Sequence, residues 1–230
     1  MKTMKRGFTL MELLIVLAIM GVMMGLVGFS ILGGGGNELG AAQRQLLGMV
    51  QKARTQAALS GLQTRLLINS DTDNQDRYHR YVEIVYRDAN ESESWVVAGE
   101  GKFLTDRIYF VPASDDSSSQ PDGWRSDAYS TWSNKESEPF ELDAAFKGKR
   151  KEGGSESFNY VEFDSAGNLV CQEDSSGILL PPKLVLAVGE PNPVSDDSLI
   201  RFNDPSAIAG ILMRQFGGFA VLDVNDFELP

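Results

Sequence analysis

An apolar segment near the N-terminus constrains this 230-residue chain more than any other feature. The stretch Leu10–Leu32 contains Glu12 as its only charged residue. At a rise of ~1.5 Å per residue, its 23 residues form a helix of roughly 35 Å, which is enough to cross a hydrocarbon core of about 30 Å. The sequence has no second segment of this kind. We therefore expect a single membrane-spanning helix.

The residues around this segment predict its orientation. Lys2, Lys5 and Arg6 precede the apolar run, and basic residues before a span hold that end in the cytoplasm. The chain after Leu32 is therefore expected to lie across the membrane. A secretory signal peptide ends its apolar region at a small-residue cleavage site. Here glycines lie inside and after a full-length span, which disfavours cleavage after it.

The run from Gly7 to Glu12 (GFTLME), followed by LLIVLAI at residues 13–19, forms an ordered motif. It resembles the class III signal of type IV pilins and type II secretion pseudopilins. The resemblance covers about the first thirty residues. It implies that a prepilin peptidase cuts between Gly7 and Phe8 on the cytoplasmic side and then methylates the new amino group of Phe8.

Glu12 places a carboxylate within the predicted membrane helix, which is energetically unfavourable. A carboxylate within a membrane helix costs about 2.5–3.5 kcal/mol on insertion scales, so it normally has a partner or a function. After cleavage, the amino group of Phe8 lies one helical turn away, in the same chain or in a neighbouring one. Pairing with a neighbour would set the axial register of a filament, and the resemblance implies this role in assembly. The alternative is a generic anchor whose Glu12 snorkels to the interface.

Four glycines, Gly33–Gly36, follow the span. Each costs about 1 kcal/mol relative to alanine within a helix, so we expect the helix to bend, melt or stop here. The resemblance implies a melting segment used during assembly, and a flexible linker is the alternative. An amphipathic helix is expected from Asn37, its predicted N-cap. Its apolar stripe, with spacings of three and four, consists of Leu39, Ala42, Leu46, Val50, Ala53 and Ala57.

Beyond residue 62 the pattern changes to short runs of β-branched and aromatic residues between turn signals, which predicts an antiparallel β domain. The fold class is thus α+β: a long N-terminal membrane-spanning helix followed by an antiparallel β-sheet or β-sandwich domain. The segment Ser165–Asn168 predicts a hairpin turn. Residues 205–216 fit either a strand before a Gly217–Gly218 turn or a helix with Pro205 at its start. Expected strands are Thr64–Asn69, Tyr78–Arg87, Trp95–Ala98, Ile108–Val111, Phe158–Asp164, Leu184–Val188 and Phe219–Val224.

The order of these elements supports a second resemblance. A membrane helix, an Ala-rich amphipathic helix and a β domain containing FDSAG at residues 163–167 resemble the minor pseudopilins called GspH and their FimT relatives. An acidic, Ser-rich insertion at about 114–157 departs from that pattern. FimT-like pilins that capture DNA use basic C-terminal residues, whereas residues 223–228 (DVNDFE) are acidic here. With a formal charge of −11, nucleic acid is not an expected partner.

Few residues of this chain suit catalysis or metal binding. His79 is the single histidine and lies in a run expected to be an exposed strand, so no hydrolytic triad or histidine-rich metal site is expected. Cys171 is the single cysteine and is expected to be a small buried residue. The segment Asp71–Asp76 begins like a calcium loop, but Asp76 and Val82 replace the required glycine and glutamate. We expect a solvated turn there, with no metal and no cofactor.

These observations predict a minor pseudopilin, a structural subunit of a type II secretion pseudopilus and not an enzyme. The alternatives are a minor pilin of a type IV pilus or a membrane-tethered periplasmic binding module. Expected partners are other pseudopilins or pilins, the prepilin peptidase and the inner membrane, with a secretion pore or cargo proteins as further candidates. The expected division is a cleaved leader at 1–7, a transmembrane and filament-core helix at 8–32, the glycine break and amphipathic helix at 33–62, and a periplasmic β domain at 63–230.

Loss of the leader also changes the charge. Three positive charges leave with residues 1–7, so the mature chain carries −14 in place of −11. Such a domain is expected to repel its own copies. We therefore expect it at a filament tip or diluted among other subunits.

Overall fold

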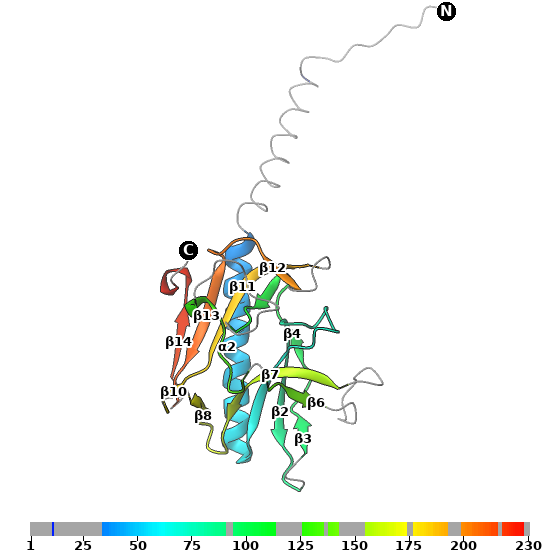
Figure 1. Ribbon diagram of the computed structural model, residues 1–230, viewed down its shortest axis with the longest axis vertical. Helices are drawn as coiled ribbons and strands as arrows, with labels where there is room; N and C mark the ends of the chain where they lie inside the picture. The colour runs from blue at the N-terminus through cyan, green and yellow to red at the C-terminus, as the bar shows by residue number, and fades with distance from the viewer. Residues whose placement is uncertain are drawn as a thin grey trace, which may run out of the picture. The chain divides into compact units, whose positions relative to one another are not determined.

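The computed structural model describes Met11 and residues 34–90, 94–113, 126–135, 138–142, 155–173, 177–192, 199–215 and 218–227 (Figure 1). The chain divides into two compact units, Met1–Asn37 and Glu38–Pro230. The predicted membrane span lies outside the described residues, apart from Met11. Among the helices that are described, none is both long and apolar enough to cross a membrane.

One long helix, α2 (Gly34–Ser60), organises the second unit. All six residues of the predicted apolar stripe are buried, each with at most 7% of its surface exposed. The predicted N-cap is wrong, because α2 begins at Gly34 and Asn37 lies inside it. Glycine adopts helical dihedrals at a cost of about 1 kcal/mol, and a favourable cap marks one possible start without forbidding an earlier one. Three glycines of the predicted break are thus helical.

The first sheet contains seven antiparallel strands and centres on β1 (Thr64–Asn69), which lies between β2 and β7. The sheet runs in the order β3, β2, β1, β7, β6, while β4 pairs with β2 and β8 pairs with β7. These strands are β2 (Tyr81–Arg87), β3 (Trp95–Val97), β4 (Lys102–Phe103), β6 (Phe140–Leu142), β7 (Glu156–Phe163) and β8 (Leu169–Val170).

The second sheet contains five antiparallel strands in the order β12, β11, β13, β14, with β5 also paired to β11. A separate two-stranded sheet joins β9 to β10, and two short 3₁₀ turns, η1 and η2, complete the described elements. Their bounds are β5 (Ile108–Phe110), β9 (Gln172–Glu173), β10 (Leu179–Leu180), β11 (Lys183–Pro191), β12 (Ile200–Phe202), β13 (Ile208–Met213), β14 (Phe219–Leu222), η1 (Ser126–Ala128) and η2 (Val224–Asp226).

The main core lies where the stripe of α2 packs against both sheets. Leu66 and Ile68 of β1, together with Ile211 of β13, belong to the same apolar cluster as the α2 stripe. Leu67, between the two β1 residues, belongs to a different cluster on the opposite face of the first sheet. This alternation follows from the two-residue period of a strand. Figure 1 shows α2 running alongside strands of both sheets, as the shared cluster requires.

The structure confirms the coarse fold class, one helix followed by antiparallel sheets, and decides the ambiguous segment 205–216. The helical alternative is wrong: β13 pairs with β11 on one side and β14 on the other. Arg214 N–H donates to the carbonyl of Gly218 at 2.8 Å across the predicted turn. Hydrogen bonds to a strand on each side outweigh the local helix-capping signal at Pro205.

The expected insertion at about 114–157 contributes to the fold where it is described. Trp132 has 2% of its surface exposed and belongs to the main core, and Ala128 is fully buried in η1. Leu142 of β6 is also buried, and β6 extends the first sheet by pairing with β7. Apolar residues inside an acidic, Ser-rich stretch therefore mark the parts that belong to the core.

Candidate functional site

The predicted processing and assembly residues, Gly7, Phe8 and Glu12, lie outside the described residues. Their roles therefore remain predictions from the sequence. Within the described residues, the polar side of α2 carries side chains that bond to the sheets and side chains that line a groove. That side has two parts, one bonded to the sheets and one facing an open groove.

The bonded part is held by polar side chains that reach backbone carbonyls. The side-chain amide of Gln43 donates two hydrogen bonds of 2.8 Å, to the carbonyls of Gly210 in β13 and Leu222 in β14. Nearer the helix end, Arg54 Nε donates to the carbonyl of Gly167 at 3.1 Å. Gly167 has a φ of 80° in the turn between β7 and β8, which confirms the predicted hairpin. These bonds join α2 to both sheets.

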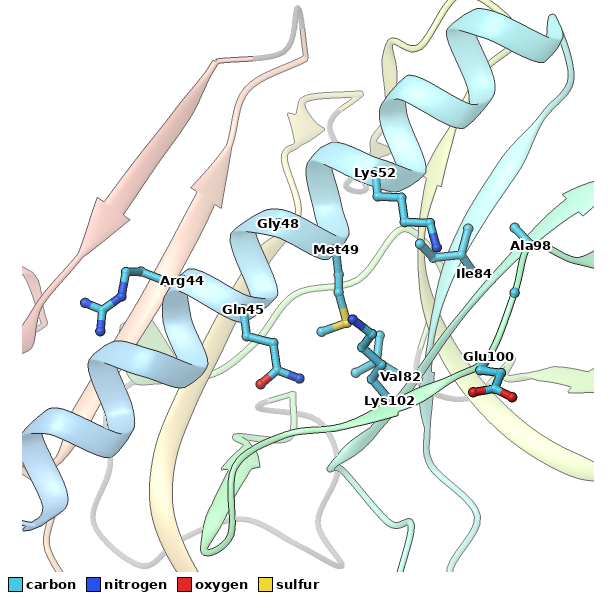
Figure 2. Close-up of a pocket in the computed structure, with 11 residues that line it drawn as sticks. Arg44, Gln45, Gly48, Met49, Lys52, Val82, Ile84, Ala98, Glu100 and Lys102 are labelled. Carbon is cyan, nitrogen blue, oxygen red and sulfur yellow. The ribbon is translucent and has the colours of Figure 1, made fainter.

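The groove lies between α2, β2 and the segment that follows β3. Its volume is about 340 Å³. Figure 2 shows the helix residues along one side and the loop before β4 along the other. The lining residues are Arg44, Gln45, Gly48, Met49, Lys52, Val82, Ile84, Ala98, Gly99, Glu100 and Lys102.

An apolar floor and two lysines define this groove. Met49, Val82 and Ile84 form the floor and belong to the main core. In Figure 2 the side chains of Lys52, from α2, and Lys102, from β4, extend over this floor from opposite sides. Both lysines are exposed, and neither forms an ion pair among the residues that the structure describes. The groove thus combines buried apolar surface with two available positive charges.

The rim of the groove is built by close packing of the loop. The side-chain amide of Gln45 donates to the carbonyl of Phe103 at 2.9 Å, which ties β4 to the helix. Gly101, just before β4, packs closely on Tyr81 of β2, because a Cβ at this position would overlap the Tyr81 side chain. Gly48 on α2 is exposed, and a Cβ added to it would meet no atom within 4 Å. Gly48 therefore leaves space in the groove that the fold does not need.

Helix α2 and the rest of the domain carry net charges of opposite sign. Helix α2 carries three basic residues and one acidic residue, Glu38, a net of +2. Residues 61–230 carry 15 basic and 30 acidic residues, a net of −15. The groove lysines are thus a local positive site on an acidic protein. No sequence motif marks either lysine, although this charge asymmetry is visible in the sequence.

The prediction that His79 lies in an exposed strand is wrong, because the residue is fully buried. Its φ of 52° turns the chain, so that β2 begins only at Tyr81. The ring stacks on Tyr78 with centroids 4.3 Å apart, and its Nδ1 lies 3.2 Å from the carbonyl oxygen of Phe110. An imidazole has an apolar face as well as polar edges, so it fits a core position when its neighbours are aromatic.

The other residues considered for chemistry lie apart from the groove. Cys171 is half-buried beside the main core, and burial raises the pKa of its thiol. Asp71 accepts a hydrogen bond from Asp73 N–H at 3.0 Å, and the segment is a turn, as predicted. Burial raises the pKa of Asp71. Among the described residues, no group of three or more histidine, cysteine or acidic side chains is placed to hold a metal.

Comparison with known proteins adds evidence at the N-terminus. Residues 2–28 match the prokaryotic N-terminal methylation motif. This match contains Gly7, Phe8 and Glu12, and it agrees with the resemblance seen in the sequence. The chain therefore carries a prepilin-type methylation motif at its N-terminus.

The remaining comparisons are weaker. The fold is similar to that of the minor pseudopilin EpsH from the type 2 secretion system of Vibrio cholerae, with 12% sequence identity and a TM-score of 0.39. The similarity covers 83% of this chain and 99% of that chain. No curated protein sequence matches this chain.

Proposed function

We propose that this chain is a minor pseudopilin, a structural subunit of a type II secretion pseudopilus that helps to export folded proteins. The single observation that carries the proposal is the N-terminal methylation motif at residues 2–28. In this proposal the motif precedes a filament-core helix at 8–32, and the β domain meets the other subunits. The role is structural and not enzymatic.

The proposal gives three N-terminal residues specific roles. A prepilin peptidase cuts between Gly7 and Phe8, and Phe8 is then N-methylated. Glu12 pairs with the Phe8 amino group of a neighbouring subunit. The burial cost of a carboxylate in a membrane helix supports this role, since the pairing offsets about 2.5–3.5 kcal/mol of insertion cost.

The proposed location follows from the basic residues before the span. The N-terminus is cytoplasmic, the helix crosses the inner membrane once, and the β domain is periplasmic. Its partners are other pseudopilins, with the secretion pore and cargo proteins as further contacts. The same motif is compatible with a minor pilin of a type IV pilus, so the test must separate the two machines.

The first test concerns processing. Mass spectrometry of the mature N-terminal peptide is expected to find N-methyl-Phe8, and a chain that retains Met1 would contradict the proposal. Glu12→Ala is expected to leave membrane insertion intact and to reduce incorporation into the filament at least severalfold. Glu12→Asp is the matched variant, because it keeps the charge and is expected to retain part of the assembly.

The second test concerns the machine. Deletion of the gene is expected to retain exoproteins in the periplasm while surface pili remain normal. Lost pili with normal secretion would instead assign the chain to a type IV pilus. Normal secretion together with normal pili would contradict both filament roles.

A further inference from the structure

The groove beside α2 has no function in the proposal above, which relies on the N-terminus. Its two lysines extend over a floor made of core residues (Figure 2). Lysine is a strongly hydrated cation that binds carboxylates as a point charge. A site that pairs exposed lysines with apolar surface fits a ligand that is both anionic and apolar.

We propose that this groove binds a short, extended peptide segment of another subunit, in which acidic residues alternate with apolar ones. The acidic side chains pair with Lys52 and Lys102, and an apolar side chain contacts the floor at Met49 and Val82. The volume of about 340 Å³ is at the small end of the range for ligand pockets, about 300–1,000 Å³, and suits only a few residues. This inference rests on the proposed function only for the identity of the partner as a subunit.

The charges around the groove further restrict which ligand can bind there. Glu100 lies at the rim, so a continuous acidic run would meet repulsion there, whereas carboxylates spaced by an apolar residue avoid it. A second copy of this chain is disfavoured, since residues 61–230 carry −15 and like-charged domains repel. Arg44 does not join the lysines, because its side chain points away from them in Figure 2.

The test uses the full-length protein in detergent micelles and a fluorescent pentapeptide, acetyl-Glu-Leu-Glu-Leu-Glu, with binding followed by fluorescence anisotropy. The neutral peptide acetyl-Gln-Leu-Gln-Leu-Gln is the ligand control. The acidic peptide is expected to bind at least tenfold more tightly than the neutral one. Equal binding of the two peptides, or no binding of either, would overturn the proposal.

Two protein variants test the position of the site. Lys52→Glu combined with Lys102→Glu is expected to weaken binding of the acidic peptide at least tenfold. Lys135→Glu combined with Arg214→Glu makes the same change of net charge at two exposed basic residues outside the groove and is expected to change binding less than twofold. Circular dichroism checks that each variant folds. An equal loss in both variants would mean that net charge, and not the groove, attracts the peptide, and would overturn the assignment.

A second groove variant guards against misfolding. Gly48→Leu fills the groove without a clash of its Cβ, so it is expected to weaken peptide binding at least fivefold in a folded protein. Unchanged binding would place the peptide elsewhere. Sedimentation tests the other occupant: a wild-type homodimer that dissociates in the double lysine variant would assign the groove to a second copy and overturn the proposal.

Failure of this inference is separable from failure of the proposed function. Peptide binding in micelles does not require a filament. Binding by a chain that never enters a pseudopilus would contradict only the filament role. Normal incorporation of the double lysine variant, with no peptide binding in the wild type, would contradict only the groove.

Discussion

The two parts of the polar side of α2 differ in where their partners lie. Gln43 finds both of its acceptors, the carbonyls of Gly210 and Leu222, within the same chain. Lys52 has no ion-pair partner among the described residues and extends over a groove. The part of the helix surface around Gln43 is therefore an internal joint, in which the polar side chain is hydrogen-bonded within the fold. The part around Lys52 leaves a positive charge and apolar surface available for binding.

This difference separates the residues of α2 that hold the fold together from those that face the proposed binding groove. The apolar stripe and Gln43 hold the two sheets on α2, so their loss is expected to affect stability. Gly48 and Lys52 lie on the groove side of the same helix, are exposed and belong to no apolar cluster, so changes to them are expected to affect binding. Stability measurements on variants of α2 can break or sharpen this division.

The largest effect on stability is expected from a change in the apolar stripe of α2. Leu46 is fully buried in the main core, and Leu46→Ala is expected to lower the free energy of unfolding by about 2–5 kcal/mol, because lost transfer energy and a cavity add. Urea denaturation of the full chain in micelles measures it. Leu59→Ala is the matched control: Leu59 is 84% exposed on the same helix, so its change is expected within about 0.5 kcal/mol. Equal effects would contradict the assigned packing.

The next effect is in the internal joint. Gln43→Leu leaves two part-buried carbonyls without their side-chain donor and is expected to cost about 1–3 kcal/mol. Gln51→Leu makes the same chemical change at an exposed position of α2 with no such bonds, and is expected to be near neutral. Thermal unfolding of both variants provides the comparison. A neutral Gln43→Leu would show that the joint does not need this bond.

A third contact, at the end of α2, predicts a pH dependence. Arg54 binds the turn that Asp164 organises. Burial alone would raise the pKa of Asp164, but hydrogen bonds from Asn168 and Ala166 outweigh it and hold this pKa below its ordinary value of 3.8. A lowered folded-state pKa gives stability that is present above the ordinary value and lost as the pH falls through the folded value.

Asp164→Asn is therefore expected to destabilise the domain by about 0.5–1.5 kcal/mol at neutral pH. The difference from wild type is expected to shrink as the pH falls below about 3.8. Thermal unfolding at pH 7 and at pH 3 measures it. Asp204→Asn is a useful comparison. The pKa of that exposed carboxyl is also lowered, by hydrogen bonds from Ser206, but among the described residues its side chain forms these bonds with Ser206 and not with α2. A pH-independent gap for Asp164→Asn would refute this account.

Much of the fold was predictable because its signals are local. The spacing of the α2 stripe, the run Thr64–Asn69 and the turn at Gly167 each follow from the periodicity or dihedral needs of a few adjacent residues. The segment 205–216 was ambiguous, since β11 and β14 supply the hydrogen bonds that make it a strand. His79 was misplaced for the same reason: its aromatic neighbour Trp132 is more than 50 residues away.

The two candidate sites, the N-terminal motif and the groove, also differ in whether their residues are adjacent in the sequence. The motif at Gly7–Glu12 is contiguous, so the sequence alone predicts it. The groove requires Lys52 and Lys102 to meet, and only the pairing of β4 with β2 beside α2 brings them together. Charge asymmetry between α2 and the remaining domain was the one available signal. It indicates a surface of interest but not which residues converge.

The smallest expected effect tests whether the groove side of α2 is free of the fold. Gly48→Ala is expected to stabilise the protein by about 0.5–1 kcal/mol, because alanine favours the helix and its Cβ would meet no atom within 4 Å. Gly40→Ala, elsewhere on α2, would place its Cβ 3.6 Å from Arg44, an ordinary contact, and is expected to give a similar gain. Thermal unfolding measures both. A gain at Gly40 with a loss at Gly48 would mean that the groove side of the helix is packed within the fold, and the division between joint and groove would fail.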